Sequence, residues 1–93
     1  MADTIYEKEP LEIQIPVPGG TYEVTLYITA TEDTEFSVQE QTQQFALDQT
    51  PIKKGEKRDF TFPVTVSGEM YGVGLYIFCD EGLTAAATVS PIA

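Results

Sequence analysis

The sequence predicts an all-β protein, an antiparallel β-sandwich of seven to eight strands. Apolar residues recur at every second position along most of the chain, which is typical of strands with one buried face. Short groups rich in glycine, proline and charged residues separate these runs. No segment shows the 3.6-residue apolar spacing of an amphipathic helix, which argues against an α/β fold. A chain of 93 residues in this pattern fits two packed sheets in a single domain, residues 1–93.

The first half of the chain predicts two strands and the start of a third. Apolar residues alternate over 11–17, and the Pro-Gly-Gly group at 18–20 then supplies a turn. Residues 21–30 form the longest run, with the apolar side chains at the even positions. The charged segment 31–35 interrupts the alternation, which resumes at Phe36 and Val38. After a polar run, Phe45 and Leu47 take it up again and predict a further short strand.

The second half predicts a loop followed by three further strands. Residues 48–51 are expected to form the loop, and alternation returns over 60–66. Pro63 lies on the polar face of that run, and a proline removes one ladder donor, so this strand is expected at a sheet edge or at a bulge. Two final alternating runs follow, 73–79 and 83–89.

Composition excludes several classes of protein. A net charge of −10 argues against nucleic-acid binding, which needs clustered lysine and arginine. No apolar run reaches the roughly 18 residues of a membrane helix, and nothing resembles a signal peptide. The start at Met1 is therefore expected to be the edge of a domain excised from a larger multidomain protein. The single cysteine, Cys79, cannot form an internal disulfide and is expected to be a small buried apolar residue.

The chemistry of the side chains argues against an enzyme. The chain has no histidine, which removes the commonest general base, the Ser–His and Cys–His nucleophile pairs and most zinc sites. Carboxylate pairs are available, but they lie mainly in turns or at polar strand positions, where solvation explains them. No glycine-rich phosphate loop precedes a helix. We expect a non-catalytic domain.

No cofactor is expected, with calcium as the one open alternative. Glu32, Asp33 and Glu35 cluster in one loop, and Asp80 and Glu81 in another. Carboxylate oxygens are the ligands that calcium prefers, but the spacing matches no metal-loop consensus.

Four of the five basic residues crowd into one short segment: Lys53, Lys54, Lys57 and Arg58. Such a basic spot on an acidic domain could meet an acidic ligand. The alternative is a charged turn at 53–56 that keeps a hairpin soluble.

Three aromatic residues occupy positions that the alternation turns away from the core: Tyr27, Tyr76 and Phe78. Outward aromatic rings on two strands could form a platform on which a sugar ring stacks. The alternatives are cross-strand pairs, docking of a neighbouring domain, or cover by a loop or by the N-terminal segment 5–6.

The glutamine-rich run 39–44 offers amide groups that suit hydroxyl-rich ligands, with Gln41 and Gln43 as the candidate contacts. The alternation also turns Glu40 toward the core. Burying this carboxylate alone costs several kcal/mol. It is therefore expected either to be held by backbone donors at a strand bend or to lie at a bulge.

Three segments together resemble a known family. Residues 18–26 are similar to the P-x-G-x-Y-x-V-T turn and strand in the N-terminal β-sandwich of bacterial rhamnogalacturonan acetylesterase-like proteins. Residues 36–40, the Lys-Gly-Glu group at 54–56 and the strand 60–66 follow in the order of that family. The similarity covers about half of the chain. An Arg-Arg pair of the family is replaced here by Thr42-Gln43 or Gln43-Gln44, so contacts made by those arginines have no matching side chains.

This resemblance implies a jelly-roll-like, galactose-binding type of sandwich attached to an SGNH-type esterase that deacetylates pectin. The Ser–Asp–His chemistry of such an enzyme belongs to a separate downstream domain. The resemblance also implies secretion from a bacterium.

Together these observations predict a monomeric accessory module that binds a plant cell-wall polysaccharide of the pectin type. The candidate residues divide into three groups: Tyr27, Tyr76 and Phe78 for stacking; Gln41 and Gln43 for hydroxyls; Lys57 and Arg58 for uronate carboxylates. They cannot all share one site. The alternative is a structural or protein-interaction module without a ligand, which packs against an adjoining esterase domain or a surface-protein neighbour. A third possibility is that the isolated domain self-associates through an edge strand.

Overall fold

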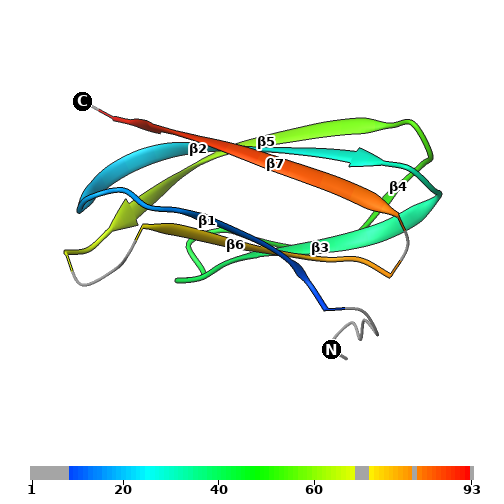
Figure 1. The fold of residues 1–93 in the computed structure, drawn as a ribbon, viewed down its shortest axis with the longest axis horizontal. Helices are drawn as coiled ribbons and strands as arrows, with labels where there is room; N and C mark the ends of the chain where they lie inside the picture. Colours follow the sequence, from blue (N-terminus) through cyan, green and yellow to red (C-terminus); the bar gives the residue numbers. More distant parts are fainter. Residues whose placement is uncertain (1–8, 69–71, 81, 93) are drawn as a thin grey trace.

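The computed structural model describes residues 9–68, 72–80 and 82–92, and all of its regular secondary structure is β (Figure 1). Seven strands follow one another in these residues: β1 (Leu11–Ile15), β2 (Gly20–Ala30), β3 (Thr34–Glu40), β4 (Ala46–Ile52), β5 (Lys57–Val66), β6 (Val73–Phe78) and β7 (Leu83–Pro91). The predicted antiparallel β-sandwich is confirmed. The described part of the chain has no helix that could span a membrane.

The strands form two antiparallel sheets that pack face to face. One sheet has four strands in the order β1-β6-β3-β4, and the other has three in the order β5-β2-β7. Among the described strands, only β3 and β4 are consecutive neighbours within one sheet, and every other connection crosses between the sheets. Strands β1 and β7 lie near each other along one side of the sandwich (Figure 1).

The central strand β2 shows how the sequence pattern becomes a buried face. Its even positions, from Tyr22 to Ala30, are buried, and its odd positions are exposed or half-buried. The Tyr22 hydroxyl donates a 2.7 Å hydrogen bond to the Pro18 carbonyl oxygen, which anchors the preceding Pro-Gly-Gly turn. The predicted strand and turn are therefore confirmed.

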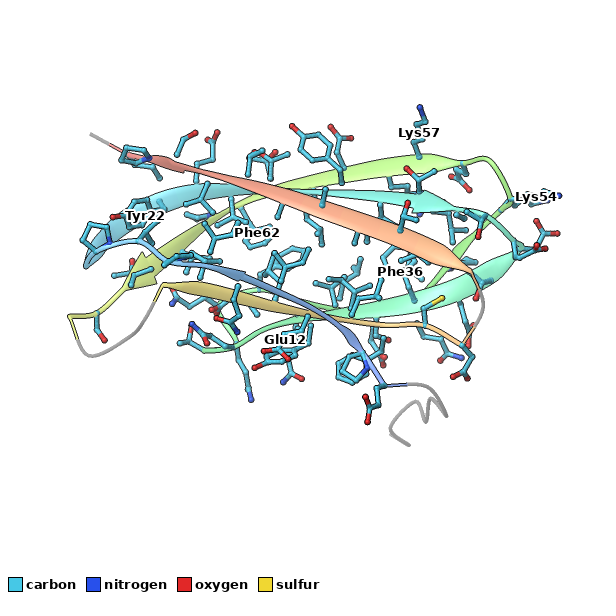
Figure 2. The ribbon with its side chains drawn as sticks, in the orientation of Figure 1. Glu12, Tyr22, Phe36, Lys54, Lys57 and Phe62 are labelled. Carbon is cyan, nitrogen blue, oxygen red and sulfur yellow. The ribbon has the colours of Figure 1, made fainter. Side chains whose placement is uncertain are left out.

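Aromatic rings fill the middle of the core between the two sheets. Figure 2 shows Phe36 of the four-stranded sheet and Phe62 of the three-stranded sheet between the layers. Phe45 stacks on Phe62 with ring centroids 3.9 Å apart and an angle of 5° between the planes. Phe60 makes tilted contacts with both Phe36 and Phe45. These contacts join the two sheets, because the rings come from both of them.

One predicted loop is wrong. Residues 48–51 lie within β4 and are not a loop. The β3–β4 pairing shifts register between Phe36 and Val38, and Gln49 has a φ of 42°. The Ser37 hydroxyl bonds the Asp48 carboxylate and accepts the Gln49 N–H, so a side chain from β3 holds the irregular part of β4. A bulge breaks the alternation of inward and outward side chains, so residues 48–51 lack the two-residue period by which a strand is predicted.

Three local predictions are confirmed. Pro63 lies on β5, which is an edge strand. Cys79 is a buried free cysteine. Residues 53–56 form a turn, closed by the Glu56 N–H on the Lys53 carbonyl oxygen at 2.8 Å.

Candidate functional site

The outward aromatic residues lie on opposite faces of the sandwich. Tyr27 stands on the outer face of the three-stranded sheet, between Asp59 of β5 and Ala86 of β7, and is 46% exposed. Tyr76 stands on the outer face of the four-stranded sheet, between Glu12 of β1 and Gln39 of β3. The two tyrosines therefore cannot contribute to one stacking platform.

Phe78 lies on the same strand and the same outer face as Tyr76, opposite Ser37 of β3. Both rings are half-buried. Both rings are cross-strand neighbours of polar side chains on β1 and β3. This arrangement matches the alternative that these aromatic residues form cross-strand pairs and not a sugar-binding platform. The N-terminal segment 5–6, which the sequence offered as a cover, lies outside the described residues.

Two glutamines of the predicted hydroxyl-binding set differ in their surroundings. The Gln41 side-chain amide donates a 2.7 Å hydrogen bond to the Gly72 carbonyl oxygen, so it links the β3–β4 loop to the start of β6. Gln43 is exposed and has a φ of 63°, in the left-handed region. Gln41 therefore has a structural partner that the sequence does not reveal.

Glu40 is fully buried and supports the same loop. Its Oε1 atom accepts the N–H groups of Thr42 and Gln44, each at 3.0 Å, and also the Thr42 hydroxyl. Its Oε2 atom is buried and has no hydrogen-bond partner among the described residues. The expectation that backbone donors hold this carboxylate at a strand bend is confirmed. A carboxylate that caps a loop in this way needs no ligand to explain it.

Lys57 and Arg58 are neighbours in sequence but point to opposite sides of β5. Lys57 is opposite Thr29 on the outer face, where Figure 2 shows it pointing away from the sandwich. Arg58 is opposite the buried Ile28 and turns toward the gap between the sheets. The two cations cannot bind one uronate carboxylate together.

Arg58 lies at the rim of an open hollow of about 310 Å³. This volume is at the lower end of the range of about 300–1,000 Å³ that is typical of small-molecule sites. The lining residues come from one end of the sandwich, where the β2–β3 loop, the end of β4 and the start of β5 meet: Asp33, Thr34, Pro51, Ile52, Lys53, Glu56 and Arg58. The lining surface is mainly apolar, although four of the lining residues carry charge: Asp33, Lys53, Glu56 and Arg58.

Glu56 accepts hydrogen bonds from two other residues that line the hollow, Lys53 and Arg58. Its Oε1 atom accepts the Lys53 N–H at 3.0 Å, and its Oε2 atom accepts the Arg58 Nε–H at 2.9 Å. The backbone hydrogen bond from Lys53 and then the bond from Arg58 hold the pKa of the Glu56 carboxyl below its ordinary value of 4.5. The bond to Glu56 uses only Nε of Arg58, and the guanidinium carries further N–H groups on its two terminal nitrogens.

Two carboxylates of the first acidic cluster, those of Asp33 and Glu35, accept hydrogen bonds from neighbouring residues. The Asp33 carboxylate accepts the Lys54 N–H at 2.8 Å, and the Glu35 carboxylate accepts the Gln49 side-chain amide. No group of three His, Cys, Asp or Glu side chains in the described ranges is arranged to hold a metal ion. Glu81, which belonged to the second acidic cluster, lies outside these ranges.

The hollow combines residues that the sequence analysis did not place together. Lys53 and Arg58 belonged to the predicted basic spot and Asp33 to the calcium alternative, whereas Pro51 and Glu56 were not candidates. The run Pro51-Ile52 directly before a charged turn was the available signal, since it puts an apolar surface next to a cation. No protein-family model matches the chain, and a search of curated proteins finds no significant match.

Proposed function

We propose that the domain is a non-catalytic module that binds a short acidic glycan, such as a pectic uronate, weakly in the hollow beside Arg58. The observation that supports this proposal is a mainly apolar hollow that is lined by the guanidinium of Arg58. The C–H face of a sugar ring would lie on the exposed Pro51, and its carboxylate would accept hydrogen bonds from Arg58. The Asp33 and Glu56 carboxylates offer acceptors for sugar hydroxyls.

The charge distribution favours this end of the molecule for an acidic ligand. All four basic residues within the described ranges lie in residues 53–58, whereas the whole chain carries a net charge of −10. An acidic glycan is repelled by most of the surface and is attracted only near these cations. The resemblance to the sandwich of rhamnogalacturonan acetylesterase-like proteins supports the same substrate class and a role within a secreted bacterial protein that degrades glycans.

The test is a titration of the ¹⁵N-labelled domain with digalacturonate and, in parallel, with neutral digalactose, followed by NMR. We expect saturable shifts at residues of the hollow with the acidic sugar only. Arg58→Gln should weaken binding about tenfold, because it removes the charge-assisted bonds to the carboxylate.

Lys57→Gln is the matched control, because it removes the same charge one residue away on the opposite side of β5. We expect it to change the affinity less than twofold. Equal losses in the two variants would show that net charge alone governs binding, and shifts centred on Tyr27 or Tyr76 would place the site on an outer face. Either result, or silence with both sugars, would contradict the proposal.

A further inference from the structure

Among the described residues, β7 pairs only with β2, so its other side presents an open row of backbone hydrogen-bonding groups along one edge of the three-stranded sheet. The N–H of Thr31 bonds the Gly82 carbonyl oxygen, and the N–H of Ile92 bonds the Thr21 carbonyl oxygen. These two bonds lie at the two ends of the β2–β7 ladder. They show which residue pairs of the ladder are hydrogen-bonded, because hydrogen-bonded and non-hydrogen-bonded pairs alternate along antiparallel strands. The even positions of β7 therefore bond to β2, and the odd positions point their N–H and C=O groups to the open edge: Leu83, Ala85, Ala87 and Val89.

The other edge strand of this sheet, β5, shows the same alternation of bonded and outward-facing backbone groups. The Ala30 N–H bonds the Glu56 carbonyl oxygen, so even positions of β5 bond to β2 and odd positions face outward. Pro63, which has no N–H, is at an odd position, where β2 needs no donor. Thr65 is also at an odd position, and its N–H and C=O bond the side-chain amide of Gln44 instead of a strand.

Edge strands of natural sheets are protected by charges, prolines, irregularity or short length, because open edges pair with other chains. Each of the other three edge strands has at least one of these protective features. β1 has five residues and lies between Pro10 and Pro16, β4 contains Pro51 and a bulge, and β5 carries Pro63 and a run of charges. β7 has no charged residue and no proline before its last position, Pro91.

An exposed apolar side chain lies next to this edge. Leu11 of β1 is opposite the fully buried Ile77, and directly opposite residues share a face, so Leu11 points toward the other sheet. It is nevertheless 42% exposed. The three-stranded sheet therefore does not extend far enough to cover the Leu11 end of β1, although β7 is its nearest strand.

We propose that β7 accepts an extended peptide segment of a partner protein as a fourth strand of this sheet. Inward side chains of the added strand would cover Leu11, and the odd residues of β7 would supply backbone hydrogen bonds. The partner segment alternates apolar and polar residues and carries lysine or arginine at its ends. This site is separate from the hollow beside Arg58 and does not depend on the glycan proposal.

Charge complementarity selects a basic partner over a second copy of this chain. Two acidic residues lie beside β7: Glu32 lies against Gly82 at its start, and Glu23 of β2 is opposite Ser90 near its end. The basic residues of the described ranges all lie in residues 53–58, on the side of β4 and β5. Pairing of two β7 strands would bring two acidic sides together, whereas a basic segment would be attracted.

The experiment uses three synthetic peptides and the complete chain. The first probe is Lys-Val-Thr-Val-Thr-Val-Thr-Val-Lys with blocked ends, the second has glutamate in place of both lysines, and the third is the first with N-methylated valines. We expect the first peptide to bind and to slow amide exchange at least tenfold at Leu83, Ala85, Ala87 and Val89. The even amides of β7 should change little, because they already bond to β2. The second and third peptides should bind at least tenfold more weakly.

Ala87→Pro tests the edge directly, because it removes one outward donor and leaves the bonds to β2 in place. It should weaken binding of the first peptide about tenfold. The matched control is Thr61→Pro, which removes an outward donor from the equivalent edge of β5, and it should change binding less than twofold.

Several outcomes would overturn the proposal. Equal losses from Ala87→Pro and Thr61→Pro would show that the effect is not specific to β7. Equal binding of the N-methylated peptide would show that backbone bonds are not used, and this test holds even if Ala87→Pro fails to fold. A doubling of mass in sedimentation that Ala87→Pro abolishes would make a second copy the occupant of the edge.

Discussion

The side-chain amide of Gln44 takes the place of a neighbouring strand along Thr65. Its Nε2 atom donates to the Thr65 carbonyl oxygen at 2.9 Å, and its Oε1 atom accepts the Thr65 N–H at 2.8 Å. Gln44 belongs to the loop of the four-stranded sheet, whereas Thr65 belongs to the edge of the three-stranded sheet. One glutamine therefore closes an open edge and joins the two sheets at the same time.

Gln44→Ala should lower the free energy of unfolding by about 1 kcal/mol. Two hydrogen bonds to the backbone are lost, but the site is exposed and water can replace them in part. Urea denaturation measures the change. Gln39→Ala, an exposed glutamine on the outer face of β3, serves as the control and should change stability by less than about 0.5 kcal/mol. Equal effects of the two substitutions would show that the Thr65 contact adds nothing.

Glu40→Ala should be far more damaging, with a loss of about 3 kcal/mol in the same assay. The carboxylate is fully buried, and its removal leaves the N–H groups of Thr42 and Gln44 without their acceptor. Glu40→Gln keeps a carbonyl oxygen of the same shape and should cost clearly less. A stability loss for Glu40→Gln as large as that for Glu40→Ala would show that the negative charge, and not the acceptor, is what the loop requires.

Gly72→Ala should destabilise the fold by more than about 3 kcal/mol. Gly72 has a φ of 132°, and an added Cβ atom would collide with the Ile15 carbonyl oxygen and the backbone of Pro16. Gly68→Ala is the matched control, since an added Cβ there meets nothing within 4 Å. It should change stability by less than about 0.5 kcal/mol. Thermal unfolding followed by circular dichroism compares the two, and similar melting temperatures would contradict the expected collision.

The Glu56 carboxyl should titrate below its ordinary pKa of 4.5. The Lys53 N–H and the Arg58 guanidinium both bond its ionised form, so its pKa is lower in the folded protein than in the unfolded chain. A lowered carboxyl pKa stabilises the fold above the unfolded value, and this contribution is lost as the pH falls through the folded value. The Glu56 side chain lies at the surface and is partly exposed, so the readout is its own titration, not global stability.

Carbon-13 NMR of the Glu56 carboxyl measures this midpoint directly. Arg58→Gln should raise the midpoint toward 4.5, because one of the two donors is lost. Lys57→Gln should move it much less, since Lys57 points to the other face of β5. A wild-type midpoint at or above 4.5 would show that these two hydrogen bonds do not persist in solution.

The strands with unbroken alternation could be predicted from the sequence, and the bulged strand could not. The alternation of apolar and polar residues predicts β2 from residues 21–30 and β5 from residues 60–66, because each strand turns one face toward the core. β4 contains Pro51 and a residue with positive φ, so its side chains do not alternate, and residues 48–51 resemble a loop. The structure shows that this segment pairs with β3, and the Ser37 contacts to Asp48 and Gln49 hold its irregular part.

The candidate site was less predictable, because side-chain direction alone does not place two strands relative to one another. Alternation turned Tyr27 and Tyr76 away from the core, as the structure has them, but it could not tell that they belong to opposite sheets. It also could not tell that Asp33, Pro51 and Arg58 line one hollow, because these residues come from three different segments, the β2–β3 loop, β4 and β5.

The sequence by itself determined the all-β class, the two long strands β2 and β5, and the inward position of Glu40. Those features depend on a period of two residues, which is local. The tertiary structure decided the sheet to which each strand belongs, the hollow beside Arg58 and the unprotected edge of β7. These depend on pairing between segments far apart in the chain, and such pairing is set by the packing of the whole core.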